Sequence, residues 1–560
     1  MSNIAKPVDV KDVCIVGSGA AGGAAAYVLS KAGLKVALLE AGPWLDPEKQ
    51  FKQSLWPYEH PRRGATEDMN DDDFAPPGLA LKIPGEPYTK AKGSQFVWWR
   101  ARILGGRTNH WGRHAFRFSS SDLRRRDEDG LGVNWPLSYD ELAPYYDKVE
   151  SFVGVFGTRE NLPDYPDGVF LPAPRPRCTE LFIKKACDRV AVPCIGNRAA
   201  VLTTPLNGRP ACHYCHQCSR SCKGGSAFTS TQGFLPVATD TGNLQIITNA
   251  MAREVLVGKD GKAIGISYVD RTNRTEQQIR ARYIMLAAGT CESTRLLLNS
   301  SSTLFPNGLA NSSGVVGRFL SDHVAASGAG FFPELESIPP HNHDGTGPPH
   351  LFIAGPAASK RDSPRSYHIE FKGGRYLPFV GGFHQQICSQ FEGLGLDLKR
   401  RCRQYYGCRI YFCAVGEMVP DRDSFCDIDP VYTDEWGIPI LRFSFKRGDH
   451  EVRMAKHMHE TIRSIVEAGG GVYTSYMNDS EERPNGVSLG GECFHEIGTA
   501  RMGNDPRDSV VNAYCQSHDV KNLFVIDGAC FPSNPDKPAT LTIMALAWRA
   551  AEYLMETGRA

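Results

Sequence analysis

The chain has 560 residues, more than one hydrophobic core usually spans, so we expect two interleaved domains. Apolar residues make up 41% and charged residues 22%, as in ordinary globular proteins. The 63 basic and 62 acidic residues leave a net charge of +1, which gives no indication of nucleic-acid binding. No run of 18 apolar residues occurs, so we expect no transmembrane segment.

The first forty residues show the pattern of one β-α-β unit. Residues 13–16 are apolar and β-branched enough for a buried parallel strand. Residues 21–32 are rich in small helix-forming residues, and Gly33 favours the end of a helix there. Residues 36–40 predict the next strand.

A glycine-rich turn at residues 17–22 joins the first strand to the helix and reads GSGAAG, which matches GxGxxG. The first glycine permits the tight turn, the second lets the backbone approach a pyrophosphate, and the third lets helix and strand pack closely. Glu40 ends the second strand, where an acid meets the ribose hydroxyls. We therefore predict a site for FAD or NAD, formed by Gly17, Ser18, Gly19, Ala20, Ala21, Gly22, Glu40 and Ala41.

The rest of the chain carries weaker patterns. Residues 41–95 are rich in proline, glycine and acids, which predicts a long surface excursion, and the proline-rich residues 160–178 are expected to link elements. Antiparallel strands are expected at 245–248, 254–257 and 263–269. Further along we expect a helix at 140–152, a buried strand at 284–289, a loop over 335–365, an amphipathic helix at 451–468, a strand at 523–528 and a helix at 540–557.

Four of the 17 cysteines gather within eleven residues, with the spacing C-x2-C-x2-C-x3-C. This is the ligand spacing of bacterial ferredoxins, without their following proline, and Arg220 and Lys223 would favour thiolates. The spacing favours an iron–sulfur cluster held by Cys212, Cys215, Cys218 and Cys222. Two alternatives stay open: structural thiols or disulfides, and a zinc site with His213 and His216 as additional ligands.

Five segments together resemble the glucose-methanol-choline (GMC) oxidoreductase family over nearly the whole chain. They are the opening glycine motif with Glu40, residues 105–112 (GGRTNHWG), residues 287–289 (AAG) with 292–297 (ESTRLL), residues 316–323 (VGRFLSDH), and residues 495–503 (HEIGTARMG) with Asp527 and Gly528. Within the family, the chain is most similar to the bacterial sugar dehydrogenase and pyranose-oxidase-like branch. That branch oxidises ring hydroxyls of sugars and glycosides.

The resemblance implies an α/β fold, in which a Rossmann-like FAD-binding domain is interleaved with an α+β substrate domain built on an antiparallel sheet. The FAD-binding domain would comprise residues 1–130, 236–330 and 493–560, and the substrate domain residues 131–235 and 331–492, with the cysteine-rich segment 212–222. The resemblance also selects FAD over NAD. It adds to the cofactor site Gly105, Gly106, Thr108, Asn109, His110, Trp111, Val255, Ala288, Gly289, Asp527, Gly528 and Thr540. His110 either carries the flavin covalently, as a histidine in this region can in that branch, or packs against it.

His495 stands where the family has its catalytic histidine. A neutral histidine suits a base that takes the hydroxyl proton while the hydride moves to flavin N5. The family usually places a second histidine or asparagine at the position of Pro538, whose ring can form no hydrogen bond. Three alternatives stay open: Asn534 or Lys537 is the partner, His495 acts alone, or the activity is altered.

The resemblance implies FAD-dependent oxidation of a ring hydroxyl of a sugar or glycoside to the keto form, at C3 before C2 or C1, with electrons passed to a protein or dye acceptor. The alternatives are an oxygen-using pyranose or glycoside oxidase that makes hydrogen peroxide, and a catalytically silent flavin-binding subunit. Cytochrome-linked dehydrogenases of this branch hold an iron–sulfur cluster in such a cysteine-rich segment and are exported with a small partner. The expected partners are therefore a small export subunit and a cytochrome c, and the expected location is the periplasm or, without that partner, the cytoplasm.

Overall fold

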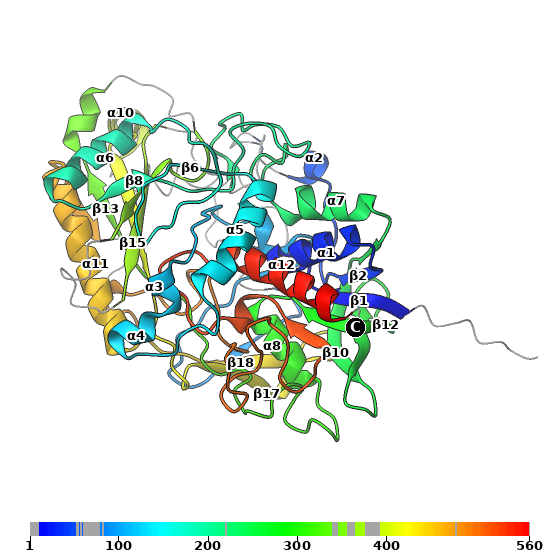
Figure 1. The fold of residues 1–560 in the computed structure, drawn as a ribbon. Coiled ribbons are helices and arrows are strands. Elements are labelled where there is room, and N and C mark those ends of the chain that lie inside the picture. The colour runs from blue at the N-terminus through cyan, green and yellow to red at the C-terminus, as the bar shows by residue number, and fades with distance from the viewer. Residues whose placement is uncertain are drawn as a thin grey trace, which may run out of the picture.

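The structure is a computed structural model that describes residues 10–51, 55, 59, 79–80, 83–218, 221–338, 345–355, 365–375, 393–475 and 479–558. Two β-sheets organise it, with a helical layer on the outer side of each (Figure 1). This architecture confirms the expected α/β class with a second, antiparallel sheet. No helix in the described ranges is long and apolar enough to cross a membrane.

The first sheet has seven strands and contains the predicted β-α-β unit. Its order is β10-β11-β12-β1-β2-β9, with β20 also paired to β12. The strands are β1 (Val10–Val16), β2 (Val36–Leu39), β9 (Leu244–Ile247), β10 (Ala250–Val257), β11 (Ala263–Asp270), β12 (Thr275–Leu286) and β20 (Leu523–Val525). Neighbouring strands run parallel from β20 through β12, β1 and β2 to β9, whereas β10 and β11 are antiparallel.

Helices α1 (Ala20–Lys31), α5 (Tyr139–Val153), α7 (Phe234–Asp240) and α12 (Thr540–Thr557) pack together in the helical layer of the first sheet. Helix α1 lies very close to the first strand because it begins with small residues. A Cβ atom added at Gly22 would stand 1.8 Å from the carbonyl oxygen of Gly17, so only glycine fits there. This confirms the packing role predicted for the third glycine of the motif.

The second sheet has six strands in the order β19-β13-β16-β15-β14-β8, and every pair is antiparallel. The strands are β8 (Cys194–Gly196), β13 (Val324–Phe331), β14 (Leu351–Ala354), β15 (Tyr367–Gly373), β16 (Arg409–Gly416) and β19 (Val472–Ser475). Helices α6 (Cys178–Arg189) and α11 (Asp449–Ala468) pack on its outer face, at the left of Figure 1. Strand β13 joins this sheet although it begins before residue 330, the predicted domain boundary.

The remaining elements are shorter and connect these layers. They are α2 (Pro47–Gln50), β3 (Leu79–Ala80), β4 (Thr89–Lys90), β5 (Arg100–Ala101), η3 (Gly106–Asn109), α3 (Ser120–Leu123), α4 (Arg125–Asp129), β6 (Val155–Gly157), β7 (Phe170–Pro172), η5 (Ser230–Gln232), α8 (Thr290–Asn299), η6 (Pro333–Ser337), α10 (Gly395–Tyr405), β17 (Phe425–Thr433), β18 (Pro439–Ser444), η9 (Pro484–Gly486) and η10 (Gly528–Cys530). Strands β17, β18 and β4 form a third, small sheet.

Several sequence-based expectations need correction. Strand β9 is parallel to β2, not antiparallel, because it continues the Rossmann-like order at the edge of the first sheet. The expected loop over 335–365 contains strand β14, and the expected linker at 160–178 contains β7. Most of the predicted surface excursion at 41–95 lies outside the described residues.

Candidate active site

A cavity of about 660 Å³ lies between the two sheets. Its size falls within the range of roughly 300–1,000 Å³ that is typical of small-molecule sites. One wall comes from the glycine turn after β1, from residues 250–252 and 287–292, and from the start of α12. The opposite wall comes from β13, β15 and β16 and from residues 492–496.

The glycine turn presents bare backbone to this cavity. Gly17 has a φ of +100°, and an added Cβ would lie 2.3 Å from the carbonyl oxygen of Ala287. An added Cβ at Gly19 would meet nothing within 4 Å, because this residue faces the open cavity. No side chain caps the N-terminus of α1, so its first amide groups are left for a ligand, and the helix dipole favours an anion there.

Glu40 lies beside this turn and is 6% exposed. Its carboxylate accepts hydrogen bonds from the Ser18 hydroxyl and, at 2.8 Å, from the Gly42 amide, and burial raises its pKa. Ser18 Oγ in turn accepts from the amide of Gly105 at 2.8 Å, which ties the first predicted segment to the second. Since Glu40 and Ala41 both line the cavity, an acceptor stands where the ribose hydroxyls are expected.

Residues 105–111 form the next part of the wall through η3. Gly106, Thr108, His110 and Trp111 line the cavity. Gly105 and Asn109 lie behind them, where the Asn109 side-chain amide donates to the carbonyls of Leu104 and Gly106, each at 3.0 Å. The indole of Trp111 donates to the Phe228 carbonyl at 2.9 Å, so this wall is held in place by its own polar groups.

Asp527 joins the last two predicted cofactor segments. Its carboxylate accepts from the amide of Gly289 at 2.9 Å, from the Ser293 hydroxyl and from the amide of Ala529 at 3.0 Å. The residues of these segments that line the cavity are Ala288, Gly289, Asp527, Gly528 and Thr540. Val255 does not line it. Its amide donates to Oγ of Ser300 at the C-terminus of α8, and residues 250–252 of the same strand line the cavity instead.

His495 lines the cavity and is paired with a histidine to which the sequence assigned no role. Its Nδ1 lies 2.7 Å from Nδ1 of His323, and Nε2 of His323 lies 2.5 Å from the carbonyl oxygen of Pro535. A carbonyl oxygen only accepts, so Nε2 of His323 carries the hydrogen and its Nδ1 accepts from Nδ1–H of His495. This arrangement leaves Nε2 of His495 with its lone pair, the state that a base requires.

The surroundings keep both rings neutral. Burial lowers the pKa of His323 to about 4, and burial together with His323 holds the pKa of His495 well below its usual range. Asp322 fixes the loop that carries His495, because its carboxylate accepts hydrogen bonds from the amides of Cys493 at 3.1 Å and His495 at 3.0 Å. Burial raises the pKa of Asp322 to about 6.

The two residues predicted as partners of His495 occupy other places. The side-chain amide of Asn534 donates to the backbone carbonyl of His495 at 3.1 Å, so it supports the loop and not the imidazole. Lys537 does not line the cavity. Its ammonium group is buried in ion pairs with Asp536 at 2.8 Å and Asp122 at 2.9 Å.

The opposite wall of the cavity contains polar side chains that the sequence patterns did not single out. His114, Glu370, Lys372 and Cys413 line it. The alternation of strand β15 could have indicated the two that lie on it, because Tyr367, Ile369 and Phe371 belong to the core under α11 and the residues between them face the other way. His114 follows the predicted segment 105–112 by only two residues.

The cysteine-rich segment borders the same cavity through Cys218. Burial raises the pKa of Cys212 to about 12 and that of Cys218 to about 11. Within the described part of the chain, no group of three or more histidine, cysteine or acidic side chains is arranged to hold a metal ion. Arg220, predicted to favour thiolates, lies outside the described residues.

Two buried arginines lie against this segment. Arg113 donates to the carbonyl of Cys218 at 3.1 Å, and Arg209 donates to the carbonyl of Val153 at 2.6 Å. In the ranges that the structure describes, neither guanidinium group has a carboxylate within ion-pair distance. Burial lowers the pKa of both guanidinium groups, and the cysteine-rich segment opposes this effect through Cys222 at Arg209 and through Cys218 and Cys222 at Arg113.

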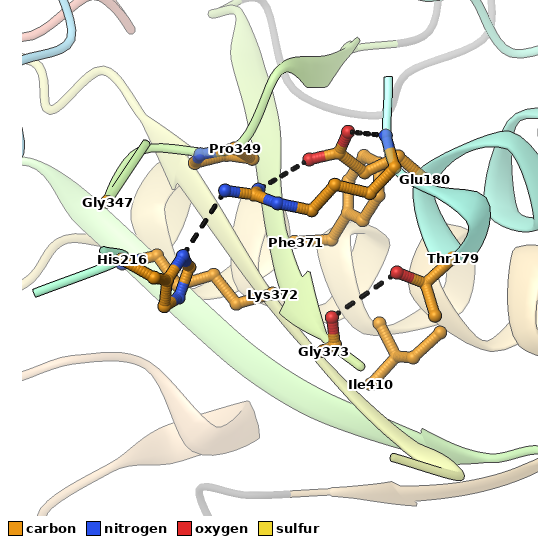
Figure 2. A pocket seen from close by; sticks show the side chains of 10 residues that line it. Thr179, Glu180, His216, Gly347, Pro349, Phe371, Lys372, Gly373 and Ile410 are labelled. Carbon is orange, nitrogen blue, oxygen red and sulfur yellow. Dashed lines mark hydrogen bonds and ion pairs between the residues drawn. The ribbon is translucent and has the colours of Figure 1, made fainter. Parts of the chain in front are cut away.

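The contacts of His216 Nδ1 are with groups other than the cysteines. Its Nδ1 lies 2.9 Å from the carbonyl oxygen of Thr346 and 3.2 Å from Nη2 of Arg177, beside a second cavity drawn in Figure 2. This cavity has a volume of about 10 Å³, which suits about one water molecule and no larger ligand. Burial lowers the pKa of His216 to about 3.

Comparisons with known proteins agree with this site. The family model "GMC oxidoreductase" matches residues 14–325 with its N-terminal part and residues 420–547 with its C-terminal part. The chain is 29% identical to 2-methyl-1,2-propanediol dehydrogenase of Mycolicibacterium austroafricanum, over 98% of this chain and 95% of that protein. It is 26% identical to the fructose dehydrogenase large subunit of Gluconobacter japonicus, over 97% of each chain.

Among solved structures, pyridoxine 4-oxidase from Mesorbium loti superimposes with a TM-score of 0.61, over 98% of this chain and 99% of that chain. With 17% sequence identity, this likeness shows a shared fold. The bare glycine turn, the buried acid after β2 and the cavity beside them fit the FAD that GMC oxidoreductases bind. The chain therefore belongs to the GMC oxidoreductase family, whose members oxidise CH–OH groups with FAD.

Proposed function

We propose that the protein is an FAD-dependent dehydrogenase that oxidises a ring hydroxyl of a sugar or glycoside to the keto form, at C3 before C2 or C1. The observation that carries the proposal is the pair His495–His323, which leaves a lone pair on His495 Nε2 inside the cavity. Bound FAD supplies the hydride acceptor. A fructose dehydrogenase and a diol dehydrogenase among the relatives support a polyhydroxylated substrate.

The chain's own residues would divide the work as follows. The glycine turn and the N-terminus of α1 hold the pyrophosphate, and Glu40 accepts from the ribose. His495 Nε2 takes the hydroxyl proton of the substrate. His323 fixes the orientation and the tautomer of His495, a task that requires no side chain at the position of Pro538. This arrangement favours a working enzyme over a silent flavin-binding subunit.

We further propose that the cysteine-rich segment holds an iron–sulfur cluster through Cys212, Cys215, Cys218 and Cys222. A cluster shares its cysteine ligands among several iron atoms, so the thiols need not converge on one point. Its negative charge would compensate the buried arginines Arg113 and Arg209. A cluster held by these cysteines would supply one-electron chemistry beside the cavity, and this favours a protein acceptor such as a cytochrome c over oxygen.

The partner proteins and the location follow from the same proposal. One relative is named a large subunit, which supports a small partner for this chain. We propose co-export with that partner to the periplasm, the cytoplasm being the location if no such partner exists. Copurification of a small subunit with the tagged chain from its native host would support the first location.

An anaerobic visible spectrum tests the dehydrogenase proposal. We expect a flavin spectrum that glucose, methyl glucoside or fructose bleaches, with slow reoxidation by air and fast reoxidation by a dye. Fast peroxide production in air would favour the oxidase alternative, and a flavin that none of these sugars bleaches would contradict the proposal.

Iron and sulfide analysis tests the cluster. We expect both elements in the purified protein, and their loss in Cys218→Ser with the flavin retained. A protein that contains zinc, or thiols without iron, would overturn the cluster proposal and leave the flavin chemistry intact.

A further inference from the structure

Glu370 lies in the cavity wall that is opposite the glycine turn. Side chains of β15 alternate, so Glu370 and Lys372 point into the cavity while Ile369 and Phe371 join the core. In the antiparallel register Glu370 lies opposite Cys413 of β16, which lines the same wall. This carboxylate lies on the second sheet, whereas the groups expected to hold the phosphates and the ribose lie on the first sheet.

Two histidines hold the carboxylate in place, His114 within the cavity wall and His368 outside the cavity. Oε2 of Glu370 lies 3.2 Å from Nε2 of His114, and Oε1 lies 3.5 Å from Nε2 of His368. The other nitrogen of His114 lies 3.2 Å from Oδ1 of Asn197. Since Asn197 Oδ1 and the carboxylate are both acceptors, the ring of His114 donates at both of its nitrogens.

Glu370 is therefore an ionised acceptor with room for another partner. His114 and His368 hold its pKa well below the usual range. Its side chain keeps 19% of its surface exposed, in a wall of the cavity. An ionised carboxylate has about four acceptor positions, and the two histidines use only one on each oxygen.

The charges behind Glu370 favour a neutral donor over an ammonium group. His368 contacts Asp536 at 3.7 Å, Asp536 pairs with Lys537, and Lys537 pairs with Asp122. Asp536 and Glu370 raise the pKa of His368 to about 9 against the effect of burial, which favours the charged form of its ring at neutral pH. The carboxylate thus lies in a compensated network, and Lys372 adds another cation to the same wall.

We propose that Glu370, braced by His114, accepts a hydrogen bond from a second hydroxyl group of the substrate while the first hydroxyl faces His495. The site would then select polyols, including sugars and diols, over monoalcohols. This inference rests on the proposed function, because it assumes that His495 receives the reacting hydroxyl. Glu370 and His495 line the same cavity, which places both groups in one binding region.

The test compares two alcohols that differ by one hydroxyl, 2-methylpropane-1,2-diol and 2-methylpropan-1-ol, on the holoenzyme with a dye acceptor. We expect wild type to favour the diol in kcat/KM by about tenfold or more, because a polar group left unpaired in the site costs affinity. In Glu370→Gln this preference should fall towards unity, through a higher KM for the diol. The rate with the monoalcohol should change little.

Two further variants separate a direct contact from general damage. His114→Gln removes the brace, so its diol preference should lie between those of wild type and E370Q, again through KM. Glu467→Gln removes an exposed carboxylate of α11, on the outer side of the same sheet, and should leave both substrates unaffected. A retained flavin spectrum in each variant would show that the fold survives.

The possible failures are distinguishable. Suppose that the alcohols bleach the wild-type flavin. The proposed hydroxyl contact is then wrong if E370Q loses the same share of activity with both alcohols, and it is also wrong if E370Q loses activity with neither alcohol. A stronger preference for an amino alcohol such as 2-amino-2-methylpropan-1-ol would also overturn it, in favour of an ammonium site. If no alcohol or sugar bleaches the wild-type flavin, the proposed function itself fails.

Discussion

At the scale of single residues, the proposed chemistry depends on two histidines that lie 172 positions apart in the sequence. The Pro535 carbonyl fixes the hydrogen of His323, and His323 fixes that of His495. The proposed base is thus oriented without the second histidine or asparagine that the family usually places at the position of Pro538. The hydrogen-bond acceptor for His495 is the ring of His323, which directly precedes β13. In this proposal it takes the place of a side chain at the start of α12.

The substitution His323→Ala tests this positioning role through a pH profile. In wild type the pKa of His495 lies well below 6.5, so flavin reduction should stay fast as the pH falls from 8 past 6.5. The base acts when unprotonated, and removing His323 removes one cause of the low pKa. We therefore expect His323→Ala to lose rate at a higher pH than wild type and to be about tenfold slower at its optimum.

His323→Asn provides the control, because the Asn side-chain oxygen can stand where Nδ1 of His323 accepts. It should recover most of the rate and the wild-type profile. Identical pH profiles for wild type and His323→Ala, measured by anaerobic stopped-flow absorbance, would refute the positioning role.

At the scale of elements, the β1–turn–α1 unit separates a structural glycine from a ligand-facing one. Gly17 has a positive φ and lies against the backbone of Ala287, whereas Gly19 has an ordinary φ of −67° and faces empty space in the cavity. The two glycines of one motif therefore serve different purposes. Substitutions at these positions should affect different measured quantities.

We expect Gly19→Ala to weaken FAD binding by about tenfold or more, because the methyl group occupies the space for the pyrophosphate. The free energy of unfolding of its apoprotein should change by less than about 0.5 kcal/mol. Gly17→Ala should instead destabilise the apoprotein by about 1–3 kcal/mol. Fluorescence titration with FAD and urea unfolding of both apoproteins provide the measurements, and equal stability losses in the two variants would contradict this division.

The sequence predicts the elements that carry strong local signals. The β-α-β unit, helix α5, helix α11 and helix α12 all lie where periodicity and glycine positions put them. The direction of β9 was not predictable from its four residues, since strand direction depends on the partner that the fold supplies. In β15, Tyr367, Ile369 and Phe371 face the core and alternate with polar residues, of which Glu370 and Lys372 line the cavity. This alternation indicates the two faces of the strand, but not that one of them borders the candidate active site.

Parts of the site depend on contacts between distant segments, and these could not be read from the sequence. His323 belongs to a segment that resembles the family, yet its role follows only from its distances to His495 and Pro535. Lys537 was a reasonable partner by position. Its ion pairs with Asp122 and Asp536, however, hold it outside the cavity. In a site assembled from separated segments, the role of a residue depends on contacts that the local sequence does not show, so assigning roles by position alone fails.

At the scale of the whole molecule, a buried network of charges connects the second sheet to the C-terminal segment. His368 of β15 contacts Asp536, which also accepts from Ser366 at 3.0 Å and from Tyr165 at 2.9 Å. The raised pKa of His368, about 9, means that the fold favours its charged form. This stabilisation is complete below pH 6.5 and is lost as the pH rises through about 9.

We expect the free energy of unfolding of wild type to fall between pH 6.5 and 9 by an amount of the order of 3 kcal/mol. His368→Gln, which cannot be charged, should be less stable at pH 6.5 and should lack this fall. Urea unfolding of both proteins at pH 6.5, 7.5 and 9 measures the difference. A constant difference in stability across this range would show that His368 is not a buried cation.

The most direct test of the account is the rate of flavin reduction in His495→Asn under anaerobic conditions, by stopped-flow absorbance. The substrate is whichever of glucose, methyl glucoside, fructose or 2-methylpropane-1,2-diol reduces the wild-type flavin fastest. Asn keeps a group that can bond His323 and lacks the lone pair of Nε2, so the flavin should remain bound and its reduction should slow by about 10²–10⁴-fold. If His495→Asn retains its flavin and the rate of flavin reduction stays within about threefold of the wild-type rate, the assignment of His495 as the base is contradicted.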